Sequence, residues 1–264
     1  MKYKLGIIGA GNMAQAIFKG AIAKEILHPN EIAIYDIYQS KAEVLSSYCG
    51  VSTAESIEQL AEESEIILIA VKPNAAKAVL EQFTFDDKAV LSIVTGLSYE
   101  RMNQSVSGKN LRFLRIVPNT PLMVGYGATA FATPCSLHDD EMTFAKDLFF
   151  ALGTVDEIDE NLMHAVTSLS GSGPAYVYMF IEALADAGVQ QGLPRDTALA
   201  LAIQTIEGGA QMVRGTGKHP ASLRDEVCSP GGTTIDAVAM LEKHGFRSSI
   251  FEAVQACAEK AKIL

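Results

Sequence analysis

The sequence predicts an α/β protein with two parts, a parallel-sheet domain at residues 1–160 and an all-α domain at residues 161–264. Three observations support this prediction. Short β-type apolar runs alternate with helical segments through the first half of the chain. A glycine-rich turn closes the first of those runs, and the second half contains helical segments without a convincing strand. Strand–helix alternation is typical of a parallel sheet with helices on both faces.

The alternating elements of the first half can be placed by their apolar spacing. Strands are expected at 4–10, 31–36, 65–71, 89–94 and 111–117. Helices are expected between them, at 12–24, 40–48, 55–63 and 74–82. Two further short runs, 127–133 and 153–158, could extend the sheet.

The second half is expected to consist of helices that cannot all be buried within one chain. Helical runs cover 174–188 and 194–213, and two more follow residues 233 and 246. The segment 174–213 is rich in Ala, Leu, Ile and Tyr on both faces, which is typical of a buried helix. Four or five helices cannot bury that much apolar surface alone. We therefore expect this half to pack against a second copy of itself and to serve as a dimerisation domain.

Composition and charge exclude several classes of function. Of the 264 residues, 48% are hydrophobic, so the chain can build a core, and the net charge of −10 argues against binding nucleic acid or anionic membranes. The four cysteines and five histidines are scattered, which predicts free thiols and no metal site. The longest apolar run, 66–71, is too short to span a bilayer. The expected location is the cytoplasm.

The stretch GIIGAGNMA carries a glycine motif with a known physical role. Gly9 permits a tight turn, Gly11 allows the backbone to approach a pyrophosphate, and Ala14 allows close packing of helix on strand. The motif closes a strand and opens a helix, whose N-terminus attracts phosphate. This context favours a Rossmann-type dinucleotide site over a purely structural turn. Its expected cofactor contacts are Ile8, Gly9, Ala10, Gly11, Asn12 and Met13.

The end of the second predicted strand bears on the choice of cofactor. Asp36 would suit the ribose 2′-hydroxyl of NADH and would repel the 2′-phosphate of NADPH. Ser40 and Lys41 lie just beyond and could serve a phosphate. The sequence therefore leaves NADPH and NADH open, with a slight preference for NADH.

The ends of the later strands should complete the cofactor site, because ligands bind at the carboxyl ends of strands in such sheets. The turn after the third strand should border the dinucleotide, although Lys72 could also be an ordinary surface lysine. The turns after the fourth and fifth strands could line the nicotinamide. The expected contacts are Ala70, Val71, Lys72, Pro73, Val94, Thr95, Gly96 and Asn119.

A second glycine turn lies near the other end of the chain, in VCSPGGTTIDA at residues 227–237. A Gly-Gly turn at a helix N-terminus can offer several backbone N–H groups to an anion. Gly231, Gly232, Thr233 and Thr234 could supply such donors, and Ser229 a hydroxyl. From the residues alone, a simple helix cap explains this stretch equally well.

Combined with the first glycine motif, SLSGSGPAY at 168–176, GLPR at 192–195 and SPGGTTI at 229–235 resemble the pyrroline-5-carboxylate reductase family over essentially the whole chain. The resemblance implies NAD(P)H-dependent reduction of a cyclic imine to L-proline. It also implies a homodimer interlocked through the helical domain, which in some members assembles into a ring of dimers. In the family, the positions matching Ser229 and Thr234 contact the substrate carboxylate. The position matching Thr167 is a candidate proton donor.

The chemistry needs no strong acid, since a cyclic imine can bind already protonated. Thr167 could hydrogen-bond the imine nitrogen, whereas His164 and His219 are interpreted as structural. Ser170 and Ser172 are expected to end or cap helices. A related hydroxyacid dehydrogenase would typically have a lysine in the helix after the glycine-rich segment, but none occurs between Lys146 and Lys218. A dinucleotide sensor without turnover is the other alternative, although it would not need a second anion site.

Overall fold

The computed structural model describes residues 1–83, 86–106 and 110–263. The chain divides into two compact units, which we describe separately. The first comprises residues 1–172 together with 257–264, and the second comprises residues 173–256. The division by contacts thus falls after Ser172, whereas the sequence placed a boundary at residue 160, which stays a prediction.

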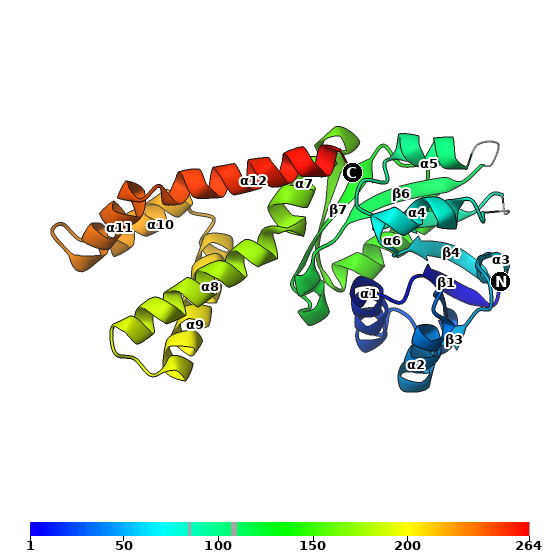
Figure 1. The fold of residues 1–264 in the computed structure, drawn as a ribbon, viewed down its shortest axis with the longest axis horizontal. Helices are drawn as coiled ribbons and strands as arrows, with labels where there is room; N and C mark the ends of the chain where they lie inside the picture. The colour runs from blue at the N-terminus through cyan, green and yellow to red at the C-terminus, as the bar shows by residue number, and fades with distance from the viewer. Residues whose placement is uncertain (84–85, 107–109, 264) are drawn as a thin grey trace. The chain divides into compact units, whose positions relative to one another are not determined.

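The first unit is built on an eight-stranded sheet, whose strands appear in Figure 1. The order across the sheet is β3-β2-β1-β4-β5-β6-β7-β8, so β1 and β4 are neighbours although two strands lie between them in the sequence. This reversal of strand order next to β1 is the feature that binds dinucleotides in Rossmann-type sheets. The strands are β1 (Tyr3–Ile8), β2 (Ile32–Tyr35), β3 (Ser52–Thr53), β4 (Ser64–Ile69), β5 (Ala89–Ser92), β6 (Arg112–Val117), β7 (Gly127–Thr133) and β8 (Gly153–Asp159).

Two strands, β7 and β8, run opposite to the other strands of the predicted parallel sheet. β7 runs antiparallel to β6, with Ile116 opposite Phe131, and β8 then runs parallel to β7. Only residues 118–126 connect β6 to β7. A parallel connection needs a crossover of a dozen or more residues, so this short link forces the strand to return in the opposite direction.

The helices of the first unit cover both faces of the sheet (Figure 1). Each predicted helix of this half is present, and the structure adds α5, α6 and α7. The helices are α1 (Asn12–Ala23), α2 (Gln39–Cys49), α3 (Ile57–Glu63), α4 (Pro73–Leu80), α5 (Tyr99–Ser105), α6 (Asp139–Phe150) and α7 (Met163–Val166). Short 3₁₀ turns lie at Pro29–Glu31, Thr120–Val124 and Glu160–Leu162, and a π-helix, η4, covers Thr167–Gly171.

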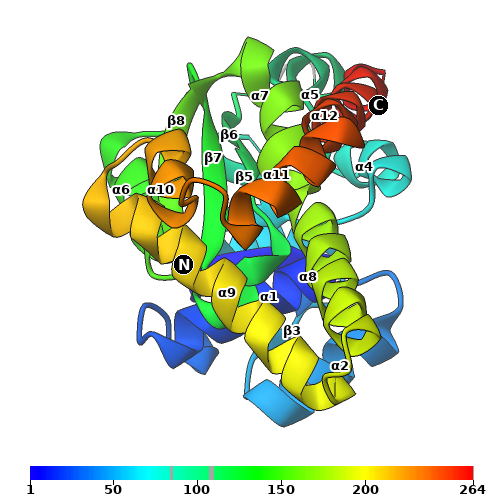
Figure 2. The same ribbon diagram turned by 90° about the vertical axis from the view of Figure 1, so that its left-hand side faces the viewer.

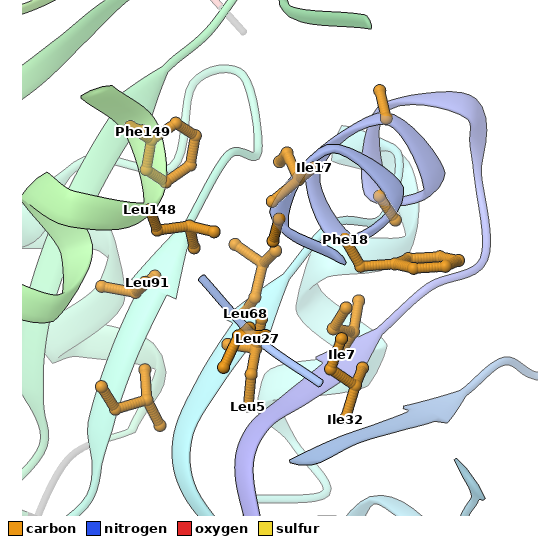
Figure 3. Close-up of a cluster of buried hydrophobic side chains, with 14 of the residues drawn as sticks. Leu5, Ile7, Ile17, Phe18, Leu27, Ile32, Leu68, Leu91, Leu148 and Phe149 are labelled. Atoms are coloured by element: carbon orange, nitrogen blue, oxygen red, sulfur yellow. The ribbon is translucent and has the colours of Figure 1, made fainter. Parts of the chain in front are cut away.

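Alternating strand residues feed two separate apolar clusters. On one face, Leu5 and Ile7 of β1 pack with Ile17 and Phe18 of α1, and the same cluster extends to Phe149 of α6 (Figure 3). On the other face, Ile8, Ile67 and Val90 pack with residues of α3, α4 and α5. Burial on both faces explains why these strands read as nearly continuous apolar runs. The sheet is therefore a rigid platform for the loops at its ends.

The second unit contains only helices and the loops that join them. They are α8 (Gly173–Gln190), α9 (Arg195–Thr216), α10 (Pro220–Val227), α11 (Thr233–Lys243) and most of α12 (Phe246–Lys262). α10 was not predicted. Helices α8 and α9 lie side by side in both views (Figures 1 and 2), and a Cβ on Gly188 would come within 3.0 Å of Ala198 Cβ. Among the described residues, no helix is both long and apolar enough to cross a membrane.

The chain leaves the first unit and returns to it at neighbouring positions. Ser172 is the last residue before the helical unit, and Cys257 is the first residue after it. The Ser172 Oγ and Cys257 Sγ atoms are 3.2 Å apart, within hydrogen-bond distance. The helical unit is thus joined to the first unit at two positions that touch.

Candidate active site

The carboxyl ends of the central strands are level with one another. Backbone hydrogen bonds continue past the strands, from Gly9 N–H to Tyr35 O at 2.7 Å and from Ala70 N–H to Ile8 O at 2.8 Å. Ile93 N–H donates to Ile69 O at 3.1 Å in the same way. The predicted cofactor contacts at residues 8–13, 70–73 and 94–96 therefore lie along one edge of the sheet.

The first glycine loop has the geometry of an anion cradle. Gly9 has a φ of +105°, and a Cβ there would come within 2.7 Å of Ala70 O, so only glycine fits. At Gly11, by contrast, a Cβ would meet nothing within 4 Å, which leaves open space at the N-terminus of α1. Ala14 is fully buried against the sheet. Gly9 thus makes a tight turn and Ala14 packs closely on the sheet, while the approach of a pyrophosphate at Gly11 stays a prediction. The first-turn N–H groups of α1 have no intrahelical acceptor.

Asp36 ties the first loop to the end of β2. Its two carboxylate oxygens accept backbone hydrogen bonds from Ala10 N–H at 2.8 Å and Tyr38 N–H at 2.9 Å. Beyond it, Tyr38, Ser40 and Lys41 are exposed at the start of α2, and the Lys41 Nζ lies 4.8 Å from the centre of the Tyr38 ring. The end of β2 therefore offers an aromatic face and a cation beside a carboxylate that already has two protein donors.

The loop after β5 borders a cavity of about 240 Å³, close to the loop that follows β4. Lys72 is exposed and Pro73 begins α4, while Val94 is buried and Thr95 is half-buried. The guanidinium of Arg101 donates to Gly96 O at 3.0 Å and so fixes the loop after β5. The cavity is lined by α4, this loop and α5.

The end of β6 holds the segment that carries Thr167. The side-chain amide of Asn119 is buried and donates to Ser170 O at 3.1 Å, while its oxygen accepts from Ala128 N–H at 2.9 Å. Thr167 is half-buried, and its hydroxyl donates to Met163 O at 2.8 Å. Protein groups thus engage both ends of the Asn119 amide, and its predicted place beside the nicotinamide stays a prediction.

The second glycine loop lies in the helical unit, where it begins α11. Gly232 N–H donates to Ser229 O at 3.0 Å, and Gly231 between them has a φ of +67°, as a type II turn after Pro230 requires. One prediction is thereby corrected, because the Gly232 N–H closes this turn and is not available to a ligand. Thr233 and Thr234 occupy the first turn of α11, where N–H groups have no intrahelical acceptor. A Cβ on Gly232 would overlap Ser229 Oγ, so this hydroxyl lies against the turn.

The two histidines near these segments have different environments. His219 caps α10, accepting through Nδ1 from Ala221 N–H at 3.2 Å, which agrees with the structural interpretation. His164 is half-buried in α7. Within the described residues, no group of three His, Cys, Asp or Glu side chains is placed to hold a metal ion.

Sequence reasoning missed one residue that shapes the site, Arg101, and expected another, Asn119, only as a contact of the nicotinamide. Arg101 supports the loop after β5, and Asn119 holds the Thr167 segment. Arg101 gave no signal, because a surface arginine in a short helix is ordinary. Asn119 gave a weak one, since a polar residue directly after a buried strand is placed at the functional edge of the sheet.

Comparison with known proteins covers the whole chain. A family model described as pyrroline-5-carboxylate reductase dimerisation matches residues 160–264, and one described as NADP oxidoreductase, coenzyme F420-dependent, matches residues 4–96. The pyrroline-5-carboxylate reductases of Synechocystis sp. and Escherichia coli are 43% and 40% identical, each over 100% of this chain and 99% of the relative. The crystal structure of Plasmodium falciparum pyrroline carboxylate reductase with NADP bound has a TM-score of 0.90 and 33% identity, and the match covers 99% of this chain and 97% of that chain.

Proposed function

The chain belongs to the pyrroline-5-carboxylate reductase family, and from this premise we propose how its two glycine loops divide the reaction. The enzyme is an NAD(P)H-dependent oxidoreductase that reduces the C=N bond of 1-pyrroline-5-carboxylate to give L-proline. The observation that carries this conclusion is full-length likeness to enzymes of this activity. The roles assigned below to individual residues are proposals.

The first loop holds the cofactor. Open space at Gly11 and the first-turn N–H groups of α1 fit a pyrophosphate, because the helix N-terminus carries partial positive charge. The loops at 70–73 and 94–96 continue along the same edge towards the nicotinamide. When bound, the dinucleotide supplies the hydride.

We assign the choice between NADPH and NADH to Lys41. The carboxylate of Asp36 is engaged by two backbone donors, which supports a role in tying two loops together. Lys41 is the first cation after β2 in the sequence, and its ammonium lies over the exposed Tyr38 ring, where it could meet a 2′-phosphate. Both cofactors are therefore expected to bind. Lys41→Met should raise the KM for NADPH about tenfold and leave the KM for NADH nearly unchanged.

The second loop holds the substrate carboxylate. The N–H groups of Thr233 and Thr234, the hydroxyl of Ser229 and the dipole of α11 together suit a small anion. Pyrroline-5-carboxylate has a single carboxylate and little apolar surface, so most of its binding must come from this anion site. The glycines shape the turn, and the donors lie at the start of the helix.

Thr167 is assigned to the imine nitrogen as a hydrogen-bond acceptor. A hydroxyl has one proton to donate, and that of Thr167 is engaged by Met163 O. Its oxygen lone pairs remain able to accept from a protonated imine, which then needs no further proton from the enzyme. We expect Thr167→Ala to keep measurable activity, and complete loss of turnover would instead show that this hydroxyl is an obligatory acid.

The helical unit indicates self-association, and we propose that the associated form is a homodimer, from which a ring of dimers can be built. Large apolar side chains exposed on α8 and α9 support this proposal. The cytoplasm stays our proposal for its location. It is supported by the four cysteines, which are all unpaired and would remain so in a reducing compartment.

The first experiment measures oxidation at 340 nm with pyrroline-5-carboxylate and either NADH or NADPH. Imine-dependent oxidation is the expected result. Binding of both cofactors without oxidation would favour a dinucleotide sensor. Oxidation of the cofactor with an oxo acid but not with the imine would favour the related hydroxyacid dehydrogenase.

A matched pair of variants tests the carboxylate site. Proline is tolerated at the first position of a helix but has no N–H, so Thr233→Pro deletes one backbone donor and Thr233→Ala deletes only the hydroxyl. The preceding Gly232 has φ −83° and ψ 166°, which a following proline permits. Thr233→Pro should raise the KM for the imine at least about tenfold relative to Thr233→Ala, with the cofactor KM unchanged. Equal imine KM values in the two variants would contradict this assignment.

A further inference from the structure

The segment Thr167–Gly171 is a π-helix whose wide turn is closed by Ser172 N–H donating to Thr167 O at 2.9 Å. Its hydroxyls donate back to carbonyls of the preceding turn, from Ser168 to Ala165 O at 2.8 Å and from Ser170 to Val166 O at 3.1 Å. Single π turns inside helices are uncommon and occur frequently at functional sites. The backbone here is thus held in an unusual shape at the residue proposed to meet the imine.

The carbonyl of Ser170 lacks the donor that an α-helix would normally give it. In an α-helix it would accept from the residue four positions later, but that residue is Pro174, which has no N–H. The donor comes instead from Asn119, which lies 51 residues earlier in the sequence. The Asn119 side chain is buried, with the residue only 7% exposed. Its Nδ2 lies 3.1 Å from Ser170 O.

The other end of the same amide is also engaged. Asn119 Oδ1 accepts from Ala128 N–H at 2.9 Å, at the start of β7. These two partners fix the orientation of the Asn119 amide. The Ala128 N–H can donate only to the amide oxygen, and the Ser170 carbonyl can accept only from the amide nitrogen. One side chain therefore joins the end of β6, the start of β7 and the π-helix. A carboxylate of the same shape could accept from Ala128 but would place an oxygen against Ser170 O.

We propose that Asn119 is a positioning residue of the reductase, which holds the Thr167–Gly171 turn against the end of β6 and so places the Thr167 hydroxyl beside the bound imine. The proposal rests on the function assigned to Thr167 above. It gives Asn119 a role through the protein backbone, whereas the sequence had indicated a contact with the nicotinamide.

The test compares Asn119→Asp with Asn119→Leu in the full-length dimer, measuring kcat, the imine KM and the NADPH Kd between pH 6 and 9. At high pH both variants should lose at least about thirtyfold in kcat, with the NADPH Kd within twofold of the parent, since the Ser170 carbonyl loses its donor in both. A protonated carboxyl can donate as the amide does. The kcat of Asn119→Asp should therefore recover towards the parent value as the pH falls, and that of Asn119→Leu should not.

Three outcomes would overturn the proposal. Parent-like kcat in Asn119→Asp across the pH range would show that the donor is not needed, and a selective loss of NADPH binding would return Asn119 to the cofactor site. If neither variant folds, the same measurements use Asn119→Asp combined with Pro174→Ala, which gives Ser170 O a backbone donor. A folded double variant with restored kcat supports the proposal, and one that stays unfolded shows a purely structural role. Failure of the proposed function itself would appear separately, as absence of imine turnover in the parent enzyme.

Discussion

In the unit formed by residues 1–172 and 257–264, large side chains such as Phe18, Phe131 and Phe149 are fully buried. In residues 173–256, all of which the structure describes, only Ala185, Ala198 and Ala202 are buried, while Met179 and Leu201 are more than half exposed. Both regions are rich in apolar residues, so the difference lies in what covers them. The first unit covers its own core, whereas the second leaves large apolar side chains exposed, as a self-associating unit is expected to do. Apolar content alone therefore does not predict the stability of an isolated unit.

The largest expected effect tests the self-contained core of the first unit. Phe131 is fully buried, and its ring packs edge-on against that of Phe149 at 5.6 Å. Phe131→Ala should lower the free energy of unfolding by about 4 kcal/mol, because it removes buried surface and leaves a cavity. Urea unfolding measures this loss. A loss below about 1 kcal/mol would mean that this core is less closely packed than the structure indicates.

The second prediction tests whether the helical surface is covered by another chain. Leu201→Glu should weaken dimerisation at least about a hundredfold, since a carboxylate would have to enter an apolar interface. Tyr48 in α2 is 84% exposed on the first unit and gives the matched control. Tyr48→Glu should leave the dimer intact and the stability within about 0.5 kcal/mol. Size-exclusion chromatography with light scattering distinguishes the two results, and an intact Leu201→Glu dimer would place the interface elsewhere.

The third prediction compares glycines of the first and second glycine loops. Gly9→Ala should cost about 2 kcal/mol of stability, because it combines a positive φ with a clash against the Ala70 carbonyl. Gly231→Ala, with a positive φ but open space, should cost about 1 kcal/mol. Gly11→Ala should leave stability within about 0.5 kcal/mol yet weaken NADPH binding about tenfold, since its methyl group would enter the pyrophosphate space. Thermal unfolding and cofactor titration together separate these cases, and unchanged NADPH affinity in Gly11→Ala would contradict the cofactor assignment.

The smallest effect concerns pH. Every buried polar or charged side chain among the described residues lies in the first unit, including Lys88, which donates to Ser64 O at 2.7 Å. Burial, assisted by the charge of Arg112, lowers the pKa of Lys88 below its usual 10.5. Between the lowered pKa and 10.5 the unfolded chain binds a proton that the folded chain does not, so the stability contributed by this group rises with pH.

The variant Lys88→Met isolates this contribution. Its unfolding free energy, subtracted from that of the parent at each pH, should give a difference that increases with pH towards 10.5. A flat difference in that window would show that the ammonium is not desolvated in the folded protein.

The sequence predicted every strand except the two-residue β3, and most helices, because each of these is marked locally by apolar runs or by spacing. α10 was missed because its eight residues carry few apolar positions and its start depends on the His219 cap. The antiparallel direction of β7 could have been predicted from the short link at 118–126. The hydrogen bond from Gly232 N–H to Ser229 O could not have been predicted, since it depends on how the turn at Pro230 and Gly231 closes. The Asn119 contact joins positions 51 residues apart, which no local pattern reveals.

Ser172 and Cys257, which flank the helical unit in the sequence, contact each other. A segment whose two ends meet is topologically an insertion, and residues 173–256 interrupt a chain that resumes at nearly the same point in space. Such a segment can be shortened, lengthened or replaced as a single module without rethreading the host fold. The dinucleotide-binding part can therefore remain unchanged while the inserted helical module changes.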